Sequence, residues 1–222
     1  MWSIVVIRKA QIRLMLALAF VLHGGTSNAW TSASGPLSDA IHQEAIDKVL
    51  ASMSASDRKT LKDQQELVDK DQEPSQSAEH AMTGITEAGQ NEATQRIYYI
   101  ALSEDLIHEA LRSAIAAKRL NKNKEALTAL GKAIHALQDA TSPAHCGFQV
   151  WSYSFGIWEM ARHVLSERVY PDDSTTKRYE SHLEGAVQYA YDIYKENQPL
   201  PGHFFDSIHG QLILPDSYLH AY

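Results

Sequence analysis

The chain has almost no cysteine, since Cys146 is the only one. An internal disulfide bond is therefore excluded, and an exported form would depend on its core and on any bound metal for stability. Basic residues are also in deficit, with 20 Lys and Arg against 27 Asp and Glu. This acidic balance excludes a general electrostatic attraction to nucleic acid, so we expect no stable nucleic-acid partner. Because no motif makes Cys146 a ligand or a nucleophile, a packing role fits it best.

Glycine and proline are scarce between residues 37 and 197, where apolar residues recur with the period of an α-helix. No strand-rich stretch, internal repeat or low-complexity segment interrupts this pattern. Residues 71–77, which include Pro74, are expected to form a loop, and the tail 198–222, with its prolines, is expected to lie along the surface. Helices are expected over residues 39–51, 56–69 or 57–69, 92–120, 124–139, 151–170 and 174–196. The pattern predicts an all-α, single-domain helical bundle.

Near the N-terminus an apolar run spans residues 14–22, which is well short of the roughly 20 residues that a helix needs to cross a bilayer. Basic residues precede it, and residues 27–29 (Ser-Asn-Ala) fit the small-x-Ala pattern of a signal-peptidase site. We expect residues 1–29 to be a cleaved signal peptide and residues 30–222 to be a secreted or periplasmic domain without a transmembrane segment. Cleavage would leave Trp30 with a free α-amine, which can bind a metal ion together with its own carbonyl oxygen.

The segment richest in potential metal ligands runs from His135 to His145. His135 and Asp139 are four residues apart, so they share one face of the expected helix and can both reach a single ion. Pro143 ends this helix and lets the chain turn His145 back toward the same cavity. Imidazole nitrogen and carboxylate oxygen together suit zinc. The segment therefore predicts a zinc site at the end of a helix.

A second pair with the same spacing, His163 and Glu167, lies on the helix expected over residues 151–170. One such pair alone is also typical of a surface ion pair, but two pairs together favour a shared metal cleft. His42 and His80 lie on or beside expected helices and could extend the set, although each could also be an ordinary exposed histidine. The remaining histidines lack ligand-like spacing and are expected on the surface; they are His108, His182, His203, His209 and His220.

In these motifs the chain resembles the bacterial zinc-dependent phospholipase C family, which is related to the fungal-type single-strand zinc nucleases. The resemblance covers most of residues 30–222 in order, with the metal motifs matching closely. It rests on the central His-Asp-His segment, on a Trp at the expected mature N-terminus, on an early His, on an Asp followed by a His, and on a closing HxxxE motif. In this sequence these residues are Trp30, His42, Asp69, His80, His135, Asp139, His145, His163 and Glu167.

The resemblance implies an all-helical scaffold with up to three zinc ions in one cleft. The implied ligands are His80, His135 and Asp139 for the first ion, Trp30, His42 and Asp139 for another, and His145, His163 and Glu167 for the third. Asp139 would bridge two ions. Asp69 would lie near the bridging water as general base or outer ligand, and Asp71 is the alternative for this acid.

Two features favour the lipase branch of this resemblance over the nuclease branch. The closing acid is Glu167, where the nucleases usually carry Asp, and the gap from Trp30 to His42 is nearer the lipase pattern. The better-known lipases place aromatic residues beside the base and before the next zinc His, where they face choline. Lys70 and Ser77 stand at those places here, which argues against a preference for phosphatidylcholine.

Three further residues are candidates for contact with a substrate. Lys70 could favour an anionic group or could be a solvated lysine at a helix end. Phe148 and Trp151 could line the cleft or belong to the core. The resulting expectation is an exported zinc metallohydrolase that acts as a phospholipase C on phospholipid head groups at a membrane surface. The alternatives are a single-strand nuclease on the same scaffold and a non-catalytic zinc-binding helical protein.

Overall fold

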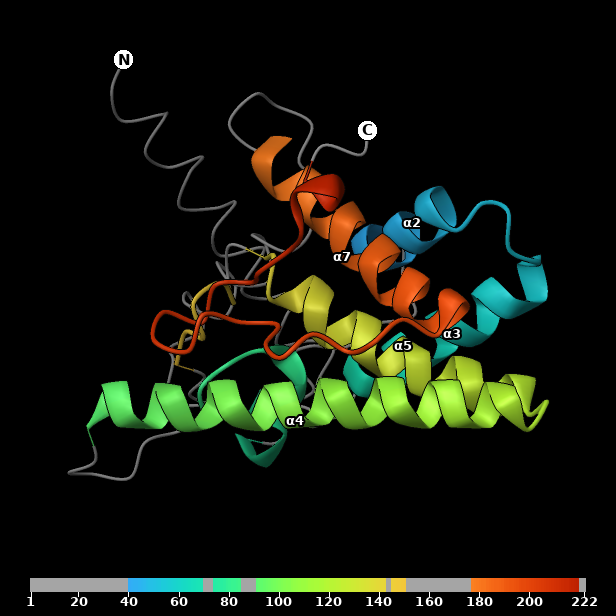
Figure 1. Ribbon diagram of the computed structural model, residues 1–222. Helices are drawn as coiled ribbons and strands as arrows, with labels where there is room; N and C mark the ends of the chain where they lie inside the picture. Colours follow the sequence, from blue (N-terminus) through green and yellow to red (C-terminus); the bar gives the residue numbers. More distant parts are fainter. Residues whose placement is uncertain (1–39, 70–73, 85–90, 143–144, 151–176, 220–222) are drawn as a thin grey trace, which may run out of the picture.

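The computed structural model describes residues 40–69, 74–84, 91–142, 145–150 and 177–219, and it confirms the expected all-α fold (Figure 1). Its elements are α2 (Ala40–Val49), α3 (Ala55–Asp69), the 3₁₀ helix η1 (Pro74–His80), α4 (Glu92–Arg119), α5 (Asn123–Asp139), α7 (Lys177–Glu196) and the 3₁₀ helix η2 (Asp216–Tyr218). The described ranges contain two isolated β-bridges, Thr83 with Val150 and Phe205 with Leu212, and no longer strand. None of the described helices is sufficiently long and apolar to cross a bilayer. The helix expected over residues 151–170 lies outside the described residues.

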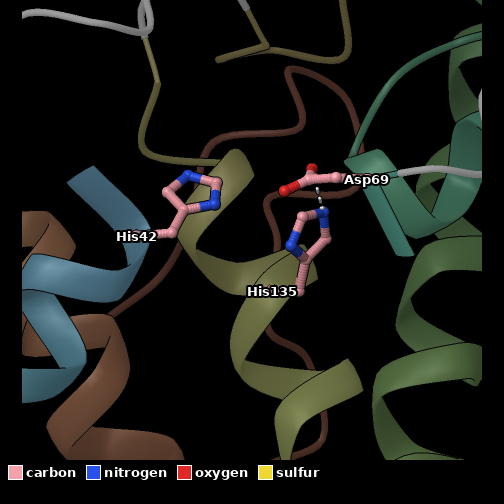
Figure 2. A group of neighbouring side chains, drawn as sticks. All are labelled: His42, Asp69 and His135. Atoms are coloured by element: carbon pink, nitrogen blue, oxygen red, sulfur yellow. Dashed lines mark ion pairs between the residues drawn. The ribbon is translucent and has the colours of Figure 1, made fainter. Parts of the chain in front are cut away.

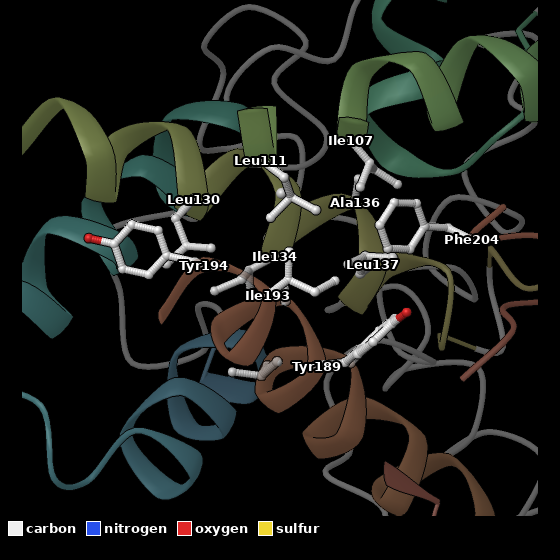
Figure 3. Packing of buried hydrophobic residues seen from close by; sticks show 14 of the residues in the cluster. Ile107, Leu111, Leu130, Ile134, Ala136, Leu137, Tyr189, Ile193, Tyr194 and Phe204 are labelled. Carbon is white, nitrogen blue, oxygen red and sulfur yellow. The ribbon is translucent and has the colours of Figure 1, made fainter. Parts of the chain in front are cut away.

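Helix α5 is the central element, because it packs against α3, α4 and α7. Its apolar face buries Leu130, Ile134 and Leu137. Figure 3 shows these side chains among Ile107 and Leu111 of α4, Ile193 and Tyr189 of α7, and Phe204 of the C-terminal tail. Burial continues to the last turn of α5, where the buried side chains become polar. The core of the bundle therefore holds the end of α5 in place from several sides.

The expected helix limits agree with the observed ones to within a few residues because local signals set them. Asn91 caps α4, since its side-chain oxygen accepts a hydrogen bond from the backbone nitrogen of Ala93 at 2.9 Å. Lys118 and Arg119 in the last turn interact favourably with the carbonyl end of the helix. Asn121, just beyond that end, has a φ of 58° and turns the chain toward α5.

Two expectations about irregular segments were wrong. The loop expected over residues 71–77 is from Pro74 onward the 3₁₀ helix η1, because proline is well suited to the first turn of a helix. The tail does not simply follow the surface, because Phe204 and Phe205 are buried in the core. The carboxylate of Glu104 on α4 accepts hydrogen bonds from the backbone nitrogens of both phenylalanines at 3.0 Å. This contact gives hydrogen-bond partners to two backbone N–H groups that burial would otherwise leave without any.

The tail also approaches the segment that follows His145, and this approach requires a glycine. Gly210 has a φ of +66°, and a Cβ atom there would lie 2.5 Å from Cδ2 of the buried Phe148. We expect Gly210→Ala to lower the free energy of unfolding by about 2 kcal/mol or more, because it combines left-handed strain with overpacking. Urea denaturation of the two proteins measures this change. Gly202→Ala is the matched control, since nothing lies within 4 Å of its added atom. Equal losses in both variants would contradict this packing.

Candidate metal centre

The last turn of α5 carries the buried pair that the sequence predicts. His135 and Asp139 are 0% and 2% exposed, and the Nε2 atom of His135 lies 3.0 Å from Oδ2 of Asp139. Both residues face into the bundle because α5 is buried on several sides at this level. The structure therefore supports a buried His-Asp pair and not a surface ion pair at this position.

A third side chain reaches the same carboxylate oxygen from η1. The Nδ1 atom of His80 lies 3.0 Å from Oδ2 of Asp139 and 3.2 Å from Nε2 of His135. His80 is buried, and it is the last residue of the 3₁₀ helix that begins at Pro74. The side chains of His80, His135 and Asp139 each offer one ligand atom, and these atoms all lie within 4.8 Å of one another. These three residues can hold one metal ion.

A second group of three shares His135 with the first. Figure 2 shows the side chains of His42 from α2, Asp69 from the end of α3 and His135 from α5 facing a common space. Oδ1 of Asp69 lies 3.4 Å from Nε2 of His135, and Nε2 of His42 lies 3.4 Å from Oδ1 of Asp139. The ligand atoms of His42, Asp69 and His135 also lie within 4.8 Å of one another. Asp69 is therefore placed where it can act as a ligand or as the base, the two roles that the resemblance implies.

The spacing of these atoms fits a shared metal ion. Zinc binds nitrogen and oxygen ligands at about 2.0–2.2 Å, so two ligand atoms of one tetrahedral ion are about 3.4 Å apart. The observed separations around Asp139 and His135, 3.0–3.4 Å, are close to that value. Buried histidines and acids of this kind can hold a metal ion, and the donor set of imidazole and carboxylate suits zinc.

His145 lies beside this group with one ring nitrogen already engaged. Its Nδ1 atom donates a hydrogen bond to the backbone oxygen of His80 at 2.5 Å and lies 4.0 Å from Oδ2 of Asp139. An imidazole that donates from Nδ1 is fixed in orientation and presents Nε2 as a ligand. His163 and Glu167, its expected co-ligands, and Trp30, expected at another ion, lie outside the described residues. So does Asp71, the alternative base.

The loop after His145 is held by Thr83. The hydroxyl of Thr83 donates to the backbone oxygen of Phe148 at 2.8 Å, and the Thr83 nitrogen donates to the Gln149 oxygen at 3.0 Å. Phe148 itself has a φ of 54°, which is strained for a residue with a side chain. Such strain persists only where the surroundings hold it, and here the contacts of Thr83 with the Phe148 and Gln149 oxygens do so.

Electrostatics keep Asp139 ionised although it is buried. Burial by itself raises the pKa of a carboxyl group, but the charges of His135 and His145 and hydrogen bonds from His135 and His80 outweigh it. The pKa of Asp139 therefore lies well below its usual range. The carboxylates of Asp139 and Asp69 both lie close to the Nε2 atom of His135. A bound divalent cation would compensate carboxylate charge at this place.

The candidate substrate contacts and the histidines expected on the surface differ in part from their predicted positions. Phe148, a candidate for the cleft wall, is completely buried and packs edge-to-face on Phe205, so it belongs to the core, because the tail covers it. Lys70 and Trp151 lie outside the described residues. Among the histidines expected on the surface, His203 and His209 are exposed, whereas His108 is half-buried and donates to the Pro201 oxygen at 2.9 Å. His182 is also half-buried, and His220 lies outside the described residues.

Comparison of the chain with protein-family models, with curated proteins and with solved structures finds no match.

Proposed function

We propose that the protein is an exported zinc-dependent phosphodiester hydrolase of the phospholipase C type. The observation that carries this proposal is the convergence of His42, Asp69, His80, His135 and Asp139 on one small volume, although they come from α2, α3, η1 and α5. Chance pairing on a surface does not explain histidines from three different elements within 3.4 Å of the Asp139 carboxylate. Their types are those used by hydrolytic zinc sites.

Asp139 and the imidazoles would hold the ions, while Asp69 would handle the proton. Bound zinc supplies Lewis acidity, which lowers the pKa of water toward neutrality and compensates the charge that a phosphodiester develops. Asp69 retains 20% exposure, so its carboxylate can accept the proton of the attacking water at the open side of the site. A new bond forms between that water oxygen and phosphorus, and the bond to the glycerol oxygen breaks. The proton passes to the leaving oxygen, which gives diacylglycerol and a phosphorylated head group.

His42 lies at the same open side, with 19% of its side chain exposed, whereas His80, His135 and Asp139 are buried. The site thus combines three buried side chains with two that are partly exposed, His42 and Asp69. Substrate would approach over His42 and Asp69. The net charge of −7 disfavours a polyanionic substrate such as single-stranded DNA, since a polyanion would be repelled along its length.

The test compares four substrates with one preparation of the protein. Zwitterionic and anionic phospholipid vesicles, single-stranded DNA and a chromogenic phosphodiester are each incubated with and without a chelator. The proposal predicts chelator-sensitive release of phosphorylated head group from at least one vesicle type. Turnover of DNA without turnover of lipid would replace the lipase by a nuclease. Zinc retention without turnover of any substrate would indicate a non-catalytic zinc protein.

A further inference from the structure

Two buried glutamines join the helices that carry the candidate ligands. Gln138 on α5 and Gln65 on α3 are 0% and 1% exposed. The amide nitrogen of Gln65 donates to Oε1 of Gln138, and Nε2 of Gln138 donates to the backbone oxygen of His42 at 3.1 Å. We call Gln65 and Gln138 the amide pair. Its hydrogen bonds run from α3 through α5 to α2.

Each end of this chain of hydrogen bonds lies next to a candidate ligand. Gln138 directly precedes Asp139, and Gln65 lies one helical turn before Asp69 on the same face of α3. The backbone oxygen that Gln138 contacts belongs to His42 itself. The helices that present His42, Asp69 and the ligands of α5 are therefore connected directly behind the site.

The chemistry of the amide pair fits a positioning role better than a stabilising one. Burying amides is costly unless every polar atom is bonded, and Oε1 of Gln65 has no hydrogen-bond partner among the described residues. Apolar side chains of similar volume would stabilise the core at least as well. Hydrogen bonds are directional, however, so they fix the rotation and height of neighbouring helices more narrowly than apolar packing does.

We infer that the amide pair is a positioning device that sets the separation of His42 and Asp69 from His135 and Asp139, and thereby the zinc affinity of the site. This inference rests on the proposed metal-dependent function. Metal ligands must be held to within about 0.5 Å for tight binding. The intervening chain alone connects the three helices covalently, so contacts between side chains must set the distances between the helices. Neither glutamine is itself a ligand. Loss of the pair loosens the His42–Asp69 side of the site while its His80–His135–Asp139 group remains.

The test replaces each glutamine by methionine, which keeps the length of the side chain but cannot form these hydrogen bonds. Gln138→Met and Gln65→Met are titrated with zinc against a competing chelator, and cobalt(II) spectra report the coordination geometry. We expect zinc binding weakened by about 10–100-fold, the range seen when groups that orient metal ligands are removed. The cobalt spectrum should change, whereas the melting temperature of the metal-free protein should change little. The double variant should lose no more than Gln138→Met alone, because both act through one chain of hydrogen bonds.

Gln64→Met is the matched control. Gln64 is also a buried glutamine of α3, 5% exposed. It packs against Gly131 and does not belong to the amide pair. It should bind zinc as the unmodified protein does. Unchanged affinity in Gln138→Met and Gln65→Met, or an equal loss in Gln64→Met, would overturn the inference while leaving the proposed function intact. Absence of zinc binding by the unmodified protein would overturn the proposed function and this inference with it.

Discussion

Replacing Asp139 with asparagine should lower kcat/KM for a phosphodiester by about 10³-fold or more and reduce the bound zinc. The carboxylate of Asp139 lies 3.0 Å from both His80 and His135 and 3.4 Å from His42, so it contacts three of the other four members of the cluster. Asparagine keeps the shape but removes the negative charge. The several kcal/mol that metal ions contribute to a charged transition state correspond to at least that factor, since each 1.36 kcal/mol is tenfold in rate.

Asp63→Asn controls for a change of charge alone. Asp63 is an exposed residue of α3 whose carboxylate pairs with Lys59 at 2.7 Å. Its solvent-exposed surroundings differ from the buried surroundings of Asp139. It should retain full turnover and full zinc content. Kinetics on the chromogenic substrate and metal analysis of the same samples give both quantities. Turnover by Asp139→Asn within about tenfold of the unmodified protein would show that the Asp139 carboxylate is not required for catalysis.

Removing the metal should abolish activity and lower the melting temperature by about 8–16 °C. At a free zinc concentration about a thousandfold above Kd, binding stabilises the folded state by about 4 kcal/mol. For a domain of this size each kcal/mol corresponds to roughly 2–4 °C. Without zinc, the buried carboxylate of Asp139 depends on the surrounding imidazoles alone for its compensation. Thermal unfolding with and without chelator measures the shift.

Added zinc should restore both the activity and the melting temperature, whereas magnesium or calcium should not, because imidazole ligands do not suit these hard cations. Asp139→Asn should show a much smaller shift with chelator than the unmodified protein. A melting temperature that is insensitive to chelator, together with full activity, would contradict a metal-dependent site.

Local features of the sequence were sufficient to predict most of the helices. The cap at Asn91 and the apolar periodicity of α5 act within a few residues, and the pair His135 and Asp139 follows from helical geometry alone. The contact of His135 with Asp69 joins residues that are distant in the sequence. No local pattern predicts such a contact, so only the resemblance to a family placed these two residues in one site.

The features that were missed depend on contacts between distant segments. Gln65 meets Gln138 across 73 positions, and Glu104 meets Phe205 across 101, so no local pattern announces either contact. For the tail, its prolines suggested a surface path, but the burial of two adjacent phenylalanines outweighs that local preference.

Anomalous diffraction at the zinc absorption edge, from crystals of the protein, is the most direct test of a zinc ion at this cluster. We expect a zinc ion within about 2.0–2.2 Å of the imidazole nitrogens of His80 and His135 and of the Asp139 carboxylate. Zinc-soaked crystals that show these side chains ordered as described, with no anomalous density among them, would contradict this expectation.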